Sequence, residues 1–144
     1  MPQVTNVDFL DKEFVKRLRD PKSADHSMIR DFVLSLAVCH NIICTEKNGK
    51  IIYDASSPDE LALVNFAKFV GLEFKGIDEK QRILVFDHMA NTTLSFELLH
   101  TLEFNSTRKR MSVIIKENSK SSSKYIIYCK GADSVILKKM EDKR

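Results

Sequence analysis

Apolar residues recur at helical spacing in the first part of the chain. One such segment ends near His40, and Ser23, Asp25 or Ser27 can cap its start. Its apolar face consists of Ile29, Phe32, Val33, Leu36 and Ala37. A charged, weakly patterned segment over residues 8–20 predicts a shorter helix before it. We therefore expect the chain to begin with two helices.

A further helix is predicted between Ser57-Pro58 and Gly71, because these residue types favour the start and the end of a helix. The turn signal Asn48-Gly49 indicates a hairpin before it, with strands at Ile42–Thr45 and Ile51–Asp54.

From residue 72 onward the pattern becomes that of strands joined by short turns. The expected strands are Leu72–Lys75, Arg82–Asp87, Leu94–Phe104, Met111–Lys116 and Lys124–Cys129. A short helix over Ala132–Met140 follows them. Early helices and then consecutive strands predict an α+β fold, an antiparallel sheet of about six strands flanked by helices.

Length and composition limit the function classes. With 144 residues, 43% of them hydrophobic and 30% charged, the chain corresponds to one globular domain. Its 23 basic and 20 acidic residues give a net charge of +3, too close to neutral to imply nucleic-acid or membrane partners. Cys39, Cys44 and Cys129 lie among apolar neighbours, and we expect buried free thiols in a reducing compartment.

Phe104 is followed by the cationic cluster Arg108-Lys109-Arg110. An aromatic ring can stack on a base, and cations can bind phosphate oxygens, so this combination is typical of a nucleotide site. The structural alternative is a core phenylalanine that ends a strand, followed by a solvated basic turn. Against that alternative, three adjacent cations repel one another unless an anion is sometimes present.

Two further motifs have both a structural and a functional interpretation. Ser57-Pro58-Asp59-Glu60 forms a capping box in which Ser57 accepts a hydrogen bond from an orphan amide and Glu60 reaches back, which explains the motif without a ligand. Lys130-Gly131 follows an apolar strand; it is either a solvated strand end or an ammonium beside a ligand that approaches the glycine backbone closely. The sequence contains no Walker A motif, dinucleotide loop or nucleophile elbow.

Four blocks of the chain, taken together, resemble one family. They are Ala37–Asn41, Tyr53–Glu60, Phe104–Val113 and Lys130–Asp133. In this order they resemble the nucleotide-binding (N) domain of P4-type ATPases, the phospholipid flippases, over about residues 8–140. The Ser-Pro-Asp-Glu and Lys-Gly-Ala-Asp forms are similar to the lipid-flipping class and differ from those of the cation pumps.

The resemblance implies a role for each matching residue. Phe104 would stack on adenine, with Lys109 along the nucleotide and Lys130 at the floor of the pocket. Glu60 would approach the adenine edge, with neighbouring residues beside it. The implied nucleotide-binding residues are Asp59, Glu60, Phe104, Ser106, Arg108, Lys109, Met111, Lys130 and Gly131. Among these, Met111 would line the apolar wall and Arg108 would assist with the phosphates.

The resemblance also implies what the chain lacks. The aspartyl-phosphate motif of the family, its metal-binding hinge motif and its downstream arginine are not in the sequence. We therefore expect residues 1–144 to be a single nucleotide-binding domain, a soluble, monomeric cytoplasmic fragment truncated at its C-terminal side. It would bind ATP, with Mg²⁺ held by ligands elsewhere, and hand the γ-phosphate to an aspartate on another domain of a membrane pump.

The implied partners are the other domains of that pump and an accessory subunit, without nucleic acid. The fragment alone would bind ATP and not hydrolyse it. Two alternatives stand beside this function. One is a basic interaction module that uses Arg108-Lys109-Arg110 to bind polyanions, and the other is a scaffold domain without a ligand.

Overall fold

The computed structural model describes residues 4, 6–118 and 121–141. Within these residues the helices are α1 (Lys12–Arg19), α2 (His26–Val38), α3 (Pro58–Val70) and α4 (Asp133–Glu141). The strands are β1 (Ile43–Lys47), β2 (Lys50–Asp54), β3 (Leu72–Ile77), β4 (Arg82–Asp87), β5 (Thr92–Leu102), β6 (Arg110–Asn118) and β7 (Ser123–Gly131). None of the described helices is long and apolar enough to cross a membrane.

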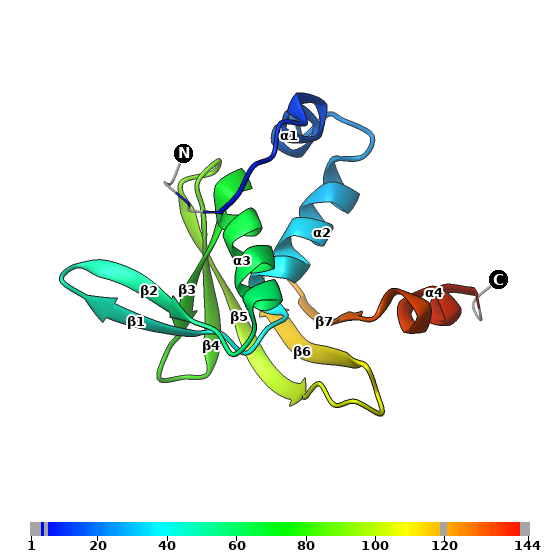
Figure 1. The fold of residues 1–144 in the computed structure, drawn as a ribbon. Coiled ribbons are helices and arrows are strands. Elements are labelled where there is room, and N and C mark those ends of the chain that lie inside the picture. Colours follow the sequence, from blue (N-terminus) through cyan, green and yellow to red (C-terminus); the bar gives the residue numbers. More distant parts are fainter. Residues whose placement is uncertain (1–3, 5, 119–120, 142–144) are drawn as a thin grey trace.

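The described strands form two antiparallel sheets. Five of them pair in the order β3-β4-β5-β6-β7, and β1 and β2 form a separate hairpin that projects from the body of the molecule (Figure 1). The predicted α+β fold with an antiparallel sheet and flanking helices is confirmed. The expected sheet of about six strands is divided into five strands and a hairpin, because β1 and β2 pair only with each other.

The start and end of α3 follow from its sequence. The Ser57 hydroxyl accepts a hydrogen bond from the Asp59 backbone N–H at 3.2 Å, and Pro58 occupies the first helical position. Gly71 ends the helix in the left-handed conformation, with φ at 119°. Between these ends, Val64, Ala67 and Val70 are buried. Local signals thus fix the helix that begins at the Ser57-Pro58 motif.

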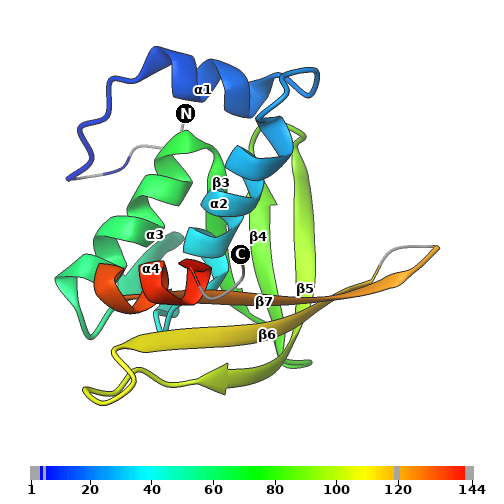
Figure 2. The ribbon, with the colours of Figure 1, turned by 90° about the vertical axis from the view of Figure 1, so that its right-hand side faces the viewer.

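The main sheet bends along β5. The register between β5 and β6 shifts between Leu98 and His100, an irregularity of the kind that bends a strand. Figure 2 shows the result: β4 and the first part of β5 run upright, whereas β6 and β7 cross below them. Helices α2 and α3 both pack against β3, and α2 also contacts β4. Helix α4 contacts β7. The core between these layers includes Val33, Val38, Val64, Val70, Leu72, Phe74, Val85, Phe96, Val113 and Ile115.

Phe104 lies outside the sheet, which corrects the predicted strand Leu94–Phe104. Strand β5 ends at Leu102, and the Phe104 side chain is 58% exposed. The Asn105 carboxamide oxygen accepts hydrogen bonds from two backbone N–H groups of the following turn, at 3.1 and 2.7 Å. Lys109 then adopts a φ of 53° before β6 begins. The alternative of a core phenylalanine is therefore wrong.

The cysteines differ in burial, which corrects the expectation that all three are buried. Cys39 is buried, Cys44 is half-buried and Cys129 is exposed, and all three are free thiols. Cys129 lies two and four residues after Ile127 and Tyr125, which are also exposed. Because side chains alternate along a strand, all three lie on the outer face of β7. Apolar neighbours in sequence did not distinguish the two faces of this edge strand.

Candidate functional site

An open pocket of about 530 Å³ lies where the α2–β1 turn, the start of α3, the β5–β6 loop and the β6–β7 ladder meet. Its lining consists of Asn41, Ser56, Ser57, Asp59, Glu60, Leu63, Phe104, Met111, Lys130 and Gly131. Six of the nine predicted site residues are in this lining: Asp59, Glu60, Phe104, Met111, Lys130 and Gly131. The other three, Ser106, Arg108 and Lys109, are on the β5–β6 loop and are not among the lining residues.

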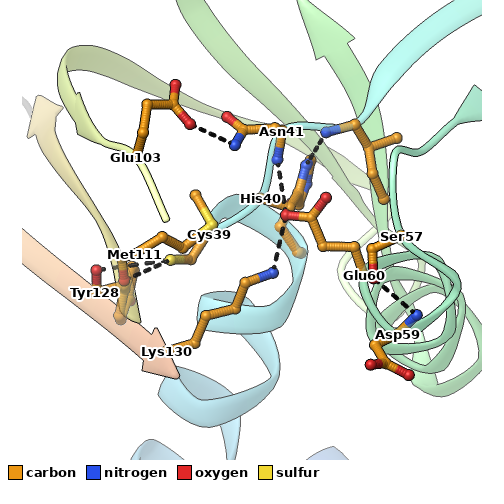
Figure 3. A network of polar contacts seen from close by, with 12 residues as sticks. Cys39, His40, Asn41, Ser57, Asp59, Glu60, Glu103, Met111, Tyr128 and Lys130 are labelled. Atoms are coloured by element: carbon orange, nitrogen blue, oxygen red, sulfur yellow. Dashed lines mark hydrogen bonds and ion pairs between the residues drawn. The ribbon is translucent and has the colours of Figure 1, made fainter. Parts of the chain in front are cut away.

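Glu60 and Lys130 form an ion pair inside the pocket (Figure 3). The Lys130 ammonium donates to Glu60 Oε1 at 3.3 Å, and the two side chains are only 23% and 12% exposed. The backbone N–H of Asn41 donates to the same oxygen at 3.1 Å. A partly buried pair of this kind is screened less by solvent than a surface pair.

The predicted capping box is therefore only half present. Ser57 caps α3 as expected, but the hydrogen bonds of Glu60 among the described residues go to Asn41 and Lys130, not back to the backbone of Ser57. The Lys130 ammonium adds the attraction of an opposite charge, which a backbone amide at the start of α3 would not supply. Glu60 connects the start of α3 to the rest of the pocket.

The β6–β7 ladder sets the position of Lys130. Lys130 pairs with Met111, whose side chain is 2% exposed, and Gly131 pairs with Arg110. A Cβ atom at Gly131 would lie 2.6–2.7 Å from Arg110 Cβ and Cα and would also collide with the Lys109 carbonyl oxygen. The next backbone N–H, of Ala132, donates to that carbonyl at 2.9 Å. Only glycine allows the two strands to approach this closely.

The cationic cluster is bonded in part to its own backbone. The Arg108 guanidinium donates to the Glu103 carbonyl oxygen at 2.8 Å, and that of Arg110 donates to the Arg108 carbonyl oxygen at 3.1 Å. These bonds stabilise the loop that carries Phe104. Of the lining residues that the structure describes, Lys130 is the only base, whereas Asp59 and Glu60 are acids.

The α2–β1 turn is held by His40. Its Nε2 lies 2.8 Å from the Ala37 carbonyl oxygen, and its Nδ1 accepts from the Ile42 backbone N–H at 3.1 Å. Burial lowers the pKa of His40 to about 4, so the ring is neutral near pH 7, and its partners assign the proton to Nε2. The ring also packs edge-on against Phe74, with centroids 4.3 Å apart.

Sequence reasoning did not identify Asn41, Ser56 or Leu63 as pocket residues, and it interpreted Ser57 only as a helix cap. For Leu63 a signal exists, because positions three and four apart share one face of a helix, and Leu63 follows Glu60 and Asp59 by those intervals. Asn41 lies in the block Ala37–Asn41, which carries part of the family resemblance, but the resemblance implied no role for Asn41 itself. No group of three His, Cys, Asp or Glu side chains in the described part of the chain could hold a metal ion.

Comparison with known proteins decides the family. The family model described as P-type ATPase, cytoplasmic domain N, matches residues 28–142. The chain belongs to this family. This N domain is similar to three phospholipid-transporting ATPases: dnf2 of Schizosaccharomyces pombe, with 39% identity over 94% of the chain; DRS2 of Saccharomyces cerevisiae, with 40% over 88%; and IC of Xenopus tropicalis, with 34% over 92%. The chain spans only 9%, 9% and 10% of the lengths of these relatives.

Proposed function

We propose that this N domain binds ATP by its adenine end, as the nucleotide-holding part of a phospholipid-transporting P-type ATPase. One observation supports this most strongly: a largely exposed aromatic ring, Phe104, lines the same pocket as the Glu60–Lys130 ion pair. An exposed phenylalanine leaves apolar surface in water, and stacking of a base on such a ring contributes about 1–3 kcal/mol.

The charges of the pocket support the orientation of the nucleotide. Two acids and one base in the lining make it a poor site for a triphosphate, since Glu60 already neutralises Lys130. Adenine is uncharged, and its exocyclic amine can donate to a carboxylate. We therefore propose that adenine lies between Phe104 and Met111, and that the phosphates extend toward the β5–β6 loop, within reach of Arg108 and Lys109, with Ser106 beside the base.

The proposed role of the domain is to position ATP. Phosphoryl transfer depends mainly on orientation and on charge stabilisation. In the parent pump, at the cytoplasmic face of a membrane, this domain would present the γ-phosphate to an aspartate on a separate domain. Mg²⁺ would arrive with the nucleotide and supply charge neutralisation there. The isolated domain would bind ATP without hydrolysing it.

A titration of the ¹⁵N-labelled domain with ATP tests this proposal. We expect the amide signals of Phe104, Lys109 and Lys130 to shift. Phe104→Ala should weaken binding by about fivefold or more, which corresponds to about 1 kcal/mol of stacking. Phe32→Ala is the matched control, because Phe32 is 54% exposed on α2 and does not line the pocket.

Three results would contradict the proposal. The first is the absence of any shift at millimolar ATP in a folded sample. The second is an equal loss of affinity in the two phenylalanine variants. The third is displacement of ATP by inorganic tripolyphosphate at equal concentration, with a steep dependence on salt, which would instead favour the basic interaction module.

A further inference from the structure

We infer that Asn41 is a positioning residue that fixes the Phe104 loop against the start of α3. This inference rests on the proposed ATP site, because the position of the Phe104 ring relative to Met111 and the Glu60–Lys130 pair determines whether a base fits in the pocket. Asn41 lies in the turn between α2 and β1, distant in sequence from both elements that it connects.

Asn41 makes two hydrogen bonds in different directions (Figure 3). Its backbone N–H donates to Glu60 Oε1 at 3.1 Å. Its side-chain Nδ2 donates to Glu103 Oε2 at 2.7 Å, a short charge-assisted bond. One residue therefore connects the start of α3 to the residue immediately before Phe104.

Glu103 is held at two points. Its carboxylate accepts from Asn41, and its carbonyl oxygen accepts from the Arg108 guanidinium at 2.8 Å. The side chains from Leu102 to Thr107 are exposed, so burial contributes little to the position of this loop. The internal bonds of Asn105 shape the turn but do not attach it to the body of the domain. The bond from Asn41 attaches the Glu103 end of the loop, and the bond from the Ala132 N–H to the Lys109 carbonyl oxygen attaches the other end.

Asn41 can serve as an anchor because the turn that carries it is itself fixed. Both ring nitrogens of His40 bond to backbone groups on either side of Asn41, and His40 is only 9% exposed. The backbone N–H of Asn41 is held in turn by Glu60. A side chain on a constrained backbone loses less entropy when it forms a bond, so that bond restrains its partner more effectively.

The geometry requires a donor at residue 41 and an acceptor at residue 103. Asn41→Asp places a second carboxylate against Glu103 and should release the loop. Adding Glu103→Gln to Asn41→Asp places an amide donor at residue 103 opposite a carboxylate acceptor at residue 41, so the hydrogen bond can form in the reverse direction. The two residues together then carry the same net charge as in the original protein. Glu103→Gln alone retains an acceptor oxygen for Asn41 but loses the charge assistance, so it should weaken binding less than Asn41→Asp does.

The experiment measures the ATP dissociation constant of these variants by NMR, together with the amide signals of residues 102–109 without ATP. Asn41→Asp should weaken binding by about three- to tenfold, the range for the net loss of one hydrogen bond. The double variant should return to within about twofold of the original protein. Asn118→Ala, at the far end of β6, removes an acceptor of Ser123 and is the control that should change nothing.

The two readouts separate this inference from the proposed function. If the unmodified domain does not bind ATP, the proposed function fails, and the amide signals still report whether Asn41 fixes the loop. Unchanged affinity and unchanged loop signals in Asn41→Asp would overturn the inference. A loss of affinity that the added Glu103→Gln does not reverse would also overturn it, because it would indicate general disruption of the turn. Thermal unfolding of each variant establishes that it is folded.

Discussion

Gly131→Ala is the substitution for which the structure gives the sharpest expectation. The motif Lys130-Gly131 had two interpretations, and the structure supplies a packing reason for the glycine. The atom added by this substitution would lie 2.6 Å from Arg110 Cβ and 2.7 Å from Arg110 Cα, and it would overlap the Lys109 carbonyl oxygen. These are mainly backbone atoms, so no flexible side chain can move aside. The two strands must separate at this end.

The magnitude has two parts. Forcing extra volume into a closely packed site costs about 1–3 kcal/mol. Separation of the strands also weakens the bond from the Ala132 N–H to the Lys109 carbonyl oxygen, a net contribution of about 0.5–1.5 kcal/mol. We therefore expect the free energy of unfolding to fall by about 2–4 kcal/mol, a large fraction of the total for a small domain.

Urea unfolding followed by circular dichroism measures this change, and Gly49→Ala provides the comparison. Gly49 has a φ of 72°, but a Cβ there would meet no heavy atom within 4 Å. That variant should lose about 1 kcal/mol from left-handed strain alone. Gly131 has no left-handed φ, so its larger loss would come from the collision.

The ATP affinity of Gly131→Ala should fall as well, because Gly131 and the neighbouring Lys130 both line the pocket. A free energy of unfolding within about 0.5 kcal/mol of the original would refute the packing argument, since surface substitutions stay within that range. A loss no larger than that of Gly49→Ala would refute it equally.

Three other expectations follow from buried groups. Burial lowers the pKa of His40 from 6.5 to about 4, so the unfolded chain binds a proton at His40 at a higher pH than the folded chain does. The free energy of unfolding should therefore fall by about 3 kcal/mol between pH 6.5 and pH 4. Urea unfolding of His40→Gln should lack this part of the pH dependence. Burial raises the pKa of the Cys39 thiol to about 11, so iodoacetamide should label the exposed Cys129 first, as peptide mass spectrometry would detect. Asp87→Ala should lower the free energy of unfolding by about 3–5 kcal/mol, because it leaves Arg30 without the carboxylate that lies 2.8 Å away; Asp87→Asn should cost less.

Much of the fold could be predicted because its signals are local. The cap at Ser57, the terminal Gly71 and the turn Asn48-Gly49 each specify backbone geometry within a few residues. The end of β5 was predicted two residues too late, since the apolar pattern continues to Phe104 whereas the pairing with β6 begins at Leu102. Where a strand ends depends on its partner and on the turn between them, and a single segment does not contain that information.

The contacts that assemble the pocket could not be predicted in this way. The three motifs that contribute Glu60, Phe104 and Lys130 were found by residue type, and the structure brings all three residues into one lining. Asn41 was not singled out, because its bonds reach residues 19 and 62 positions away. Nothing in the neighbouring sequence indicates which carboxylates a single asparagine will meet.

Glu60 does not make the predicted capping bond and is held in the pocket lining instead. Its two hydrogen bonds among the described residues both use Oε1, from the Asn41 N–H and the Lys130 ammonium. A carboxylate has a second oxygen with two further acceptor positions. The bonds to Oε1 fix the side chain within the pocket lining, so that the proposed contact from Oε2 to the adenine amine needs no further ordering of Glu60. The contacts that stabilise the fold at this point are therefore the same contacts that would prepare Glu60 for a ligand, and they explain why one short motif admits both interpretations.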